Sequence, residues 1–85
     1  MRVDFHKKFQ KHFDKLSTKV QDKFDERLKV FMKDTFAPEL RNHALHGEYL
    51  GYRSISITGD FRAVYEVQND GAVKFLFIDT HSNLY

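Results

Sequence analysis

Non-polar residues recur at helical spacing through the first 34 residues of the chain. Two stripes, each with a non-polar residue at every third or fourth position among lysine, glutamine and aspartate, predict two amphipathic helices. The stripes are Phe5, Phe9, Phe13 and Leu16, and then Val20, Phe24, Leu28 and Phe31. Thr18 and Gln21 have the spacing of a capping box, so we expect a tight turn before Thr18. The helices should then pair antiparallel, with their phenylalanine-rich sides on one common layer.

The second half of the chain has the period-two pattern of β-strands. Pro38 disfavours helical backbone at Ala37, so we expect the second helix to end near Asp34. The pair Asp70-Gly71 tolerates the positive φ of a tight turn and predicts a hairpin. The three segments predicted as strands are residues 51–58, 61–67 and 73–78. The last is almost wholly non-polar, which predicts a central strand covered on both sides.

These elements predict an α+β fold with two N-terminal helices packed on one face of a small, mainly antiparallel sheet of three to four strands. The fourth strand would be the alternating segment Arg2 to Phe5, at an edge of the sheet. We expect the other face of the sheet to stay open. The side chains expected there, from their parity along the strands, are Ser54, Ser56, Arg62 and Glu66.

Length and composition limit the classes of protein that the chain can belong to. With 85 residues it can form one domain, spanning residues 1–85, but not two. Nine phenylalanines and 41% hydrophobic residues are typical of an ordered protein. The absence of cysteine excludes a disulfide framework and thiolate metal sites. No signal peptide and no segment of about 18 apolar residues is present, so we expect a cytoplasmic protein with no membrane partner.

Charge is distributed unevenly along the chain. Residues 1–34 carry ten Lys and Arg against six Asp and Glu, whereas residues 35–85 carry four against six. A basic helical surface attracts RNA phosphates in a salt-dependent manner. Because lysine alternates with aspartate at helical spacing, an ordinary solvated helix surface explains the pattern equally well.

Candidate catalytic residues lie in the polar segments beside the predicted strands. Cutting RNA without a metal requires a base for the ribose 2′-hydroxyl, cations for the phosphate and an acid for the departing 5′-oxygen. His43 and His81 could supply the base and the acid, because histidine titrates near neutral pH. Asp60, in the turn before the second strand, could orient an imidazole. Arg53 and Arg62 could bind phosphate through their planar guanidinium groups.

Aromatic residues are candidates for contact with RNA bases. Phe61 and Tyr85 could stack on bases, as in sequence-tolerant recognition of single strands. The simpler interpretation is structural: the aromatic rings pack, the arginines pair with nearby glutamates, and histidines at strand ends form surface hydrogen bonds. His43 and His46 have the spacing of metal ligands, but no carboxylate or thiolate completes a set. We therefore expect neither a metal site nor a cofactor.

Three motifs, in order, resemble the YafQ branch of the RelE superfamily of bacterial toxins. His43 to Arg53 has the pattern H-x-L-x-G-x-x-x-G-x-R. Asp60 to Tyr65 has the pattern D-aromatic-x-x-x-Y, and Thr80 to Tyr85 reads T-H-S-x-L-aromatic. The resemblance covers residues 43–85 in motif detail and the preceding helices in layout. Three motifs in one order are far more specific than any one of them.

The resemblance implies the toxin of a type II toxin–antitoxin system, an mRNA interferase that enters the ribosomal A site and cleaves the message there. It also implies partners, namely a cognate antitoxin, the ribosome and mRNA. The catalytic set is then His43, Asp60 and His81, with Arg62 and Arg53 as phosphate-binding cations. The RNA-binding set is Phe61, Tyr85 and His46.

Two positions depart from the pattern of the family. Ser56 stands where the YafQ branch has a histidine, and Phe77 stands where it has an arginine. Arg62 could replace the missing cation. Two alternatives therefore stay open beside the endoribonuclease: a toxin of the same fold that acts by binding alone, such as a ParE-like gyrase inhibitor, or a degenerate module that only binds an antitoxin.

Overall fold

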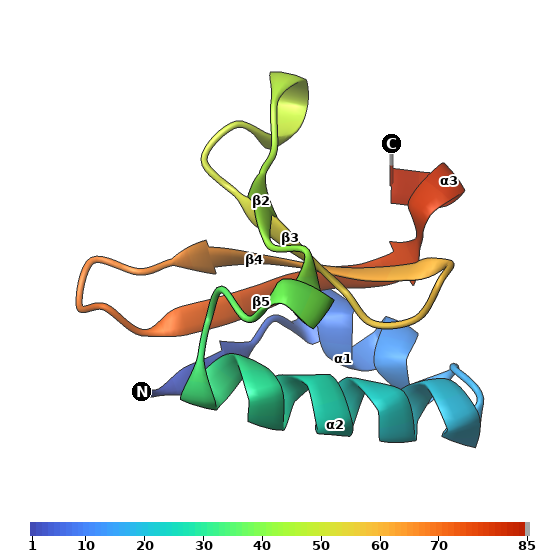
Figure 1. Cartoon of the computed structure of the whole chain (residues 1–85). Coiled ribbons are helices and arrows are strands. Elements are labelled where there is room, and N and C mark those ends of the chain that lie inside the picture. The colour runs from blue at the N-terminus through green and yellow to red at the C-terminus, as the bar shows by residue number, and fades with distance from the viewer. Residues whose placement is uncertain (85) are drawn as a thin grey trace.

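The computed structural model describes residues 1–84 and has an α+β fold, with one five-stranded sheet and two N-terminal helices on one of its faces (Figure 1). The sheet order is β1-β5-β4-β3-β2, and the strands are β1 (Val3–Phe5), β2 (His43–Ala44), β3 (Arg53–Ser56), β4 (Phe61–Val67) and β5 (Val73–Thr80). The helices are α1 (Lys7–Asp14), α2 (Thr18–Lys33) and α3 (His81–Leu84), with 3-10 turns η1 (Pro38–Leu40) and η2 (Gly47–Tyr49). The sheet exceeds the expected three to four strands because β2, with two residues, is too short to leave a pattern.

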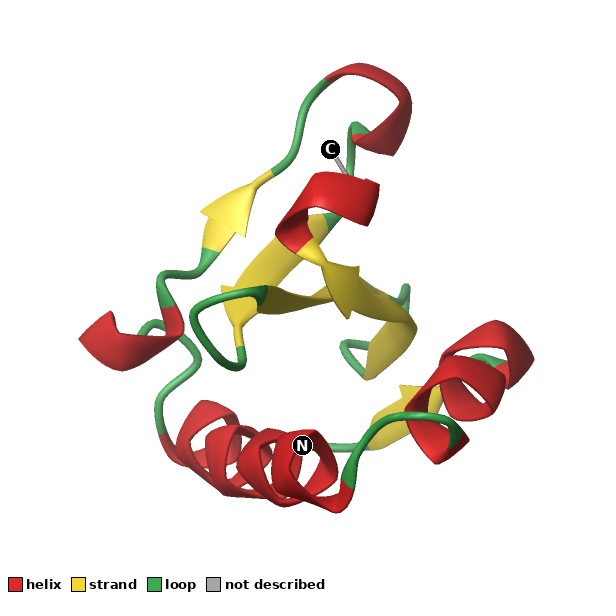
Figure 2. Ribbon diagram, turned by 90° about the vertical axis from the view of Figure 1, so that its right-hand side faces the viewer, coloured by secondary structure: helices red, strands yellow, loops and turns green. Residues whose placement is uncertain are grey.

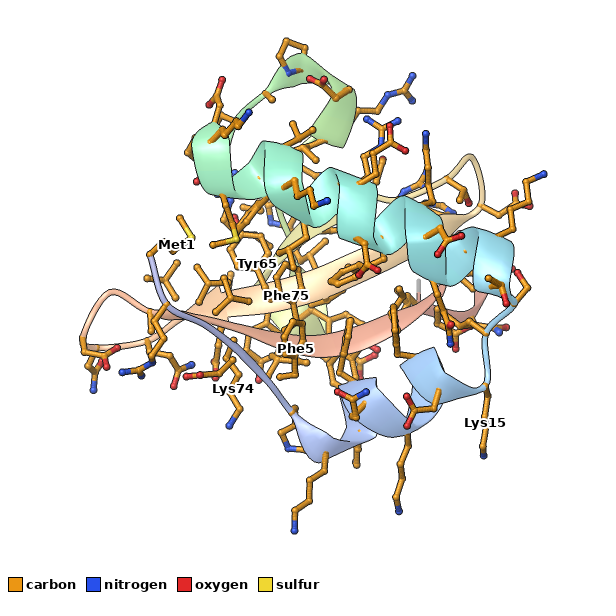
Figure 3. The ribbon with its side chains drawn as sticks, turned by 90° about the horizontal axis from the view of Figure 1, so that it is seen from below. Met1, Phe5, Lys15, Tyr65, Lys74 and Phe75 are labelled. Atoms are coloured by element: carbon orange, nitrogen blue, oxygen red, sulfur yellow. The ribbon has the colours of Figure 1, made fainter. Side chains whose placement is uncertain are left out.

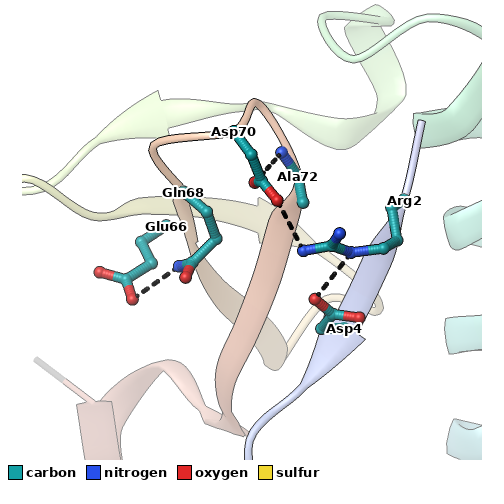
Figure 4. Close-up of polar contacts among 6 residues, drawn as sticks. All are labelled: Arg2, Asp4, Glu66, Gln68, Asp70 and Ala72. Carbon is teal, nitrogen blue, oxygen red and sulfur yellow. Dashed lines mark hydrogen bonds and ion pairs between the residues drawn. The ribbon is translucent and has the colours of Figure 1, made fainter.

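The N-terminal strand is fastened to the hairpin between β4 and β5. β1 lies at the edge of the sheet, as predicted for this segment, and pairs in parallel with β5. The Arg2 guanidinium donates to Asp4 at 3.2 Å and to Asp70 at 2.9 Å (Figure 4). Asp70 also accepts the backbone N–H of Ala72 at 3.0 Å, and this bond, aided by Arg2, lowers the pKa of the Asp70 carboxyl from its ordinary value. Gly71 has a φ of 86°, which confirms the predicted Asp-Gly turn.

Side chains cap the N-termini of both N-terminal helices. His6 Nδ1 accepts the backbone N–H of Lys8 at 3.0 Å, and Ser17 Oγ accepts that of Val20 at 3.3 Å. The prediction of Thr18 as the cap is wrong by one residue, because Thr18 already has the first helical position of α2. Ser17 keeps extended backbone angles, as an N-cap residue does, and thereby directs its hydroxyl at the free N–H groups.

An aromatic cluster fills the space between the helices and the sheet. The rings of Phe9 and Phe24 lie 5.2 Å apart, and the ring of Phe24 lies 5.5 Å from that of Phe75 on β5. Figure 3 shows this layer from the helix side, with Phe5 and Phe75 labelled. Phe5 belongs to β1 and not to the helix predicted for it, yet its ring lies 6.0 Å from that of Phe75. Each buried phenylalanine contributes about 1.5–3 kcal/mol, so this cluster is the main reason that the helices stay on the sheet.

A second, smaller core covers part of the opposite face of the sheet, which we call the upper face. Its buried members are Leu45, Val64 and Leu84, with Tyr49, Tyr52 and Phe77 packed against them. Figure 2 shows α3 and the segment of β2 and η2 on this side, with α1 and α2 on the other. The expectation of a fully open face is therefore wrong, because the short C-terminal helix and the β2–β3 connection bring non-polar side chains over it. What remains uncovered is the part of the upper face beside the turn between β3 and β4.

Candidate functional site

A row of polar side chains crosses the upper face of the sheet at the end nearest the β3–β4 turn. Ser56 on β3 lies opposite Arg62 on β4, and Arg62 lies opposite Asp79 on β5. Residues directly opposite each other in antiparallel strands project from the same face, so these three side chains are neighbours. The sequence predicted this face for Ser56 and Arg62, but Asp79 was missed, because the predicted third strand ended at residue 78 whereas β5 extends to Thr80.

A pocket of about 440 Å³ opens beside this row, and we call it the Asp60–His81 pocket. Its lining is Gly59, Asp60, Arg62, Thr80, His81 and Ser82. The backbone N–H of His81 donates to the carbonyl of Asp60 at 2.7 Å, which joins the start of α3 to the β3–β4 turn. Thr58 Oγ1 accepts the backbone N–H groups of Asp60 and Phe61, at 3.2 and 3.0 Å, and thereby fixes the turn itself. Three of the predicted catalytic residues thus share one pocket.

The guanidinium of Arg62 is held against the turn by one of its nitrogens. Nη1 donates to the carbonyl oxygens of Thr58, Gly59 and Phe61, at 3.0, 3.2 and 3.1 Å. Neither Nε nor Nη2 has a hydrogen bond to any residue in the described range 1–84. A guanidinium has five N–H donors, so Arg62 keeps donors for an anion in the pocket while its position is fixed.

Asp79 and the residues after it position the histidine of the pocket. Asp79 Oδ1 accepts the side-chain amide of Asn83 at 3.1 Å and the backbone N–H of Thr80 at 2.7 Å. These bonds fix the start of α3, where His81 is the first residue. The sequence did not single out Thr80 or Ser82 as pocket residues, although both stand beside His81 in the third motif.

His43 lies on the same face of the sheet but outside the pocket lining. His43 is opposite Ser54 in the β2–β3 ladder. Its strand, β2, is three positions from β5 in the sheet, so the backbones of the two strands lie about 14 Å apart at ordinary strand spacing. The His43 Nδ1 is 2.9 Å from the carbonyl oxygen of Arg41. Because a carbonyl only accepts, Nδ1 carries the hydrogen, and in the neutral ring Nε2 is the nitrogen that can take a proton. The structure therefore does not bring His43, predicted to share proton transfer with His81, into the lining of the pocket that contains His81.

Arg53 lies on the helix side of the sheet, so the structure does not bring together the two arginines predicted to bind phosphate, Arg53 and Arg62. Arg53 is opposite the buried Tyr65 and projects away from the upper face. Its Nε donates to Asn42 Oδ1 at 2.8 Å, and its guanidinium carbon lies 5.2 Å from the centre of the Phe36 ring. Asn42 in turn donates to the Tyr65 hydroxyl at 2.7 Å. Arg53 therefore stabilises the fold beside the main core.

The predicted RNA-binding residues have three different positions. Phe61 is opposite Thr80 and packs against the main core on the helix side, so its ring does not face the pocket. His46 is exposed at the start of η2, in the segment that covers the upper face. Tyr85 lies outside the described residues.

Residues 1–84 show neither a cluster of metal ligands nor a membrane-spanning helix. No three His, Cys, Asp or Glu side chains within this range come together in a way that could hold a metal ion. None of the helices in the same range is both long enough and apolar enough to cross a bilayer.

Comparison with known proteins gives a family for the whole chain. Residues 1–85 match the family model described as the bacterial toxin of type II toxin–antitoxin system, YafQ. No curated protein sequence matches at a significant level.

Several solved structures have the same fold. YafQ from E. coli strain BL21(DE3) is 20% identical with a TM-score of 0.79, and covers 100% of this chain and 99% of its own. A copper-bound mutant toxin from Helicobacter pylori is 27% identical with a TM-score of 0.74 and the same coverage. The E. coli DinJ–YafQ complex is 17% identical with a TM-score of 0.75, again covering 100% and 99%. The similarity extends over full chains, so the fold is shared from end to end.

Proposed function

The chain belongs to the YafQ family of bacterial toxins of type II toxin–antitoxin systems, and we propose that it is an endoribonuclease that cleaves mRNA in the ribosomal A site. The observation that carries the proposal is the presence of Asp60, Arg62 and His81 in one pocket. A carboxylate, a guanidinium and an imidazole are the groups that phosphodiester cleavage by an internal hydroxyl needs. Because translating ribosomes are in the cytoplasm, the proposed activity implies a cytoplasmic protein.

In the proposed reaction, the ribose 2′-hydroxyl loses its proton and its oxygen attacks the adjacent phosphorus. The bond from phosphorus to the 5′-oxygen then breaks, and that oxygen takes up a proton, which leaves a 2′,3′-cyclic phosphate and a free 5′-hydroxyl. Asp60 and His81 are the groups in the pocket that can exchange protons with these two oxygens. Arg62 stabilises the charge on the phosphate through the donors that the turn leaves unused.

His43 has a separate role in this proposal. Its Nε2 is directed away from the Arg41 carbonyl, and the residue is exposed on β2, two strand positions from Arg62 on β4. We assign it to contact with a neighbouring nucleotide once RNA lies across the upper face, because Asp60 and His81 already account for both proton transfers. His46, on the same segment, is assigned to RNA contact.

A cognate antitoxin is the proposed protein partner. The solved DinJ–YafQ complex is a toxin–antitoxin pair in which the toxin has this fold. An antitoxin that covers the upper face would exclude RNA from the Asp60–His81 pocket and would thereby inhibit the proposed cleavage sterically.

Growth and transcript ends after induction test the proposal. Wild-type protein, His81→Gln and His12→Gln are expressed from an inducible promoter; His12 is an exposed histidine on α1 and serves as the matched control. We expect growth arrest and new 5′-hydroxyl ends within coding sequences for wild type and His12→Gln, and neither for His81→Gln. Growth arrest by His81→Gln with the same new ends would contradict the proposal.

A non-cleaving toxin is the second candidate, and one observation favours it. Phe77, at the position where the family pattern has an arginine, packs into the second core with its ring 6.1 Å from that of Tyr49. The charge is therefore replaced by packing. Growth arrest without any new transcript ends would support this candidate, and normal growth together with antitoxin binding would support a degenerate module.

A further inference from the structure

A second and larger hollow lies on the other side of Arg62. It has a volume of about 780 Å³ and is bounded by α2, by the turn η1 and by the end of β3 with the turn that follows it. We call it the basic groove. Five of its eleven lining residues are basic and only one, Glu39, is acidic. The basic residues are Lys19, Lys23, Arg27, Arg41 and Arg62.

The positive charge of the groove is poorly compensated. Within residues 1–84, only Lys23 of these five takes part in an ion pair, with Glu26 at 3.2 Å on the exposed side of α2. Arg27 Nε is buried and has no hydrogen-bond partner in the same range. The Arg27 guanidinium has no carboxylate partner among these residues either, so its charge adds to the positive potential of the groove. Arg41 has a φ of 48° because it is the left-handed C-cap residue of η1.

The spacing of the basic residues on α2 suits a polyanion. Lys19, Lys23 and Arg27 follow each other at intervals of four, so they share one side of the helix at steps of about 6 Å along its axis. These steps are comparable to the interval between neighbouring phosphates of an extended nucleic acid strand. By contrast, Lys15, the C-cap residue of α1, points away from the body of the protein (Figure 3).

The groove and the proposed cleavage pocket adjoin each other at two shared lining residues. Gly59 and Arg62 line both of them, so a chain bound at the Asp60–His81 pocket can pass Arg62 directly into the groove. We propose that the basic groove binds the phosphodiester backbone of the RNA adjoining the cleaved linkage, and that Lys19, Lys23 and Arg27 on α2 contact successive phosphates. This inference rests on the proposed function, because it assumes that RNA occupies the neighbouring pocket.

RNA fits the groove better than a peptide does. Only Pro38 and Ile57 among the lining residues have purely hydrocarbon side chains, and Ile57 is fully buried in the main core. A helix or strand of an antitoxin would need non-polar sockets for its anchor residues. A phosphate backbone needs only positive charge and N–H donors, which the groove supplies.

Binding of a single-stranded RNA dodecamer with 2′-O-methyl riboses, which cannot be cleaved, tests the inference. The full-length protein is compared with a groove variant, Lys19→Gln/Lys23→Gln/Arg27→Gln, and a control variant, Lys7→Gln/Lys11→Gln/Lys15→Gln, on α1 and its C-cap. Both variants lose three positive charges. Affinity is measured between 50 and 300 mM salt, and circular dichroism verifies folding; Lys19→Gln/Lys23→Gln replaces the triple variant if Arg27 is needed to fold.

For the groove variant we expect binding at 0.1 M salt to weaken roughly 10- to 100-fold, and the slope of log affinity against log salt to fall by about 2. For the control variant, both the loss of RNA affinity on the log scale and the fall in slope should be less than about a third of those of the groove variant. Equal loss for the two variants overturns the inference, because it means that net charge alone attracts the RNA. Unchanged RNA affinity with weakened antitoxin binding also overturns it and assigns the groove to an acidic peptide.

The result of this binding assay can be distinguished from the result of the cleavage test of the proposed function. The dodecamer assay involves no cleavage, so a groove that fails to bind RNA leaves the result for His81→Gln intact. The converse combination is that wild-type protein produces no new transcript ends while the groove variant still loses RNA affinity. That combination would reject the proposed cleavage and keep the assignment of the basic groove to RNA binding.

Discussion

Replacing Arg62 by lysine separates charge from geometry at the candidate site. The Arg62 guanidinium donates through Nη1 to three carbonyl oxygens of the β3–β4 turn and keeps its other donors for the pocket. A lysine keeps the positive charge but has a single flexible ammonium, which cannot hold the turn and bind a phosphate at once. Loss of one positioned donor for a developing anion lowers cleavage about 10²- to 10³-fold. The bonds to the turn are only partly buried, so we expect stability to fall by about 1 kcal/mol.

The matched variant is Arg53→Lys, on the same sheet but on its other side. Arg53 bonds Asn42 and lies against the ring of Phe36, so its replacement should cost about 1–2 kcal/mol of stability. Its effect on cleavage should be less than about threefold, because it does not line the pocket. Single-turnover cleavage on stalled ribosomes gives the rates, and urea unfolding gives the stabilities. Equal rate losses for the two variants, or a larger one for Arg53→Lys, would refute this assignment.

Three further predictions concern stability. Ser54 is fully buried and its hydroxyl has no hydrogen-bond partner within residues 1–84, so Ser54→Ala should stabilise the protein by about 1 kcal/mol in urea unfolding; a loss of stability would show that the hydroxyl is bonded. Ser17→Ala should destabilise by about 1 kcal/mol and Thr18→Ala by much less, and the reverse order would restore Thr18 as the cap. Since folding lowers the pKa of Asp70, the ionised carboxylate stabilises the folded protein at neutral pH, and this stabilisation is lost as the carboxylate becomes protonated at acid pH. The difference in Tm between wild type and Asp70→Asn should therefore shrink below about pH 4. A difference in Tm that stays constant with pH would contradict this role of Asp70.

The elements that the sequence predicted well are those with long, regular patterns. The two phenylalanine stripes and the Asp-Gly turn correspond to α1, α2 and the hairpin of β4 and β5, since each rests on contacts within a few residues. The two-residue strand β2 and the short helix α3 could not be predicted, because tertiary packing of Leu45 and Leu84 over Val64 holds them in place. The second core depends on the same packing, so it was not predicted either.

The candidate site was predictable in part. Arg62 was placed on the correct face by strand parity, and the same parity puts Arg53 with Ile55 toward the helices, a signal that the interpretation of both arginines as phosphate ligands overlooked. Asp79 was missed because the non-polar pattern of the third strand ends at Ile78, whereas β5 continues to Thr80. The basic groove could not be predicted, because it depends on how α2 crosses the sheet beside Arg62.

The chemical identity of the RNA ends made by the purified protein on programmed ribosomes tests the central claim most directly. The account predicts a 2′,3′-cyclic phosphate on one fragment and a 5′-hydroxyl on the other, both absent with His81→Gln and both present with His12→Gln. Intact message on ribosomes saturated with wild-type protein would contradict the claim that Asp60, Arg62 and His81 form a cleavage site.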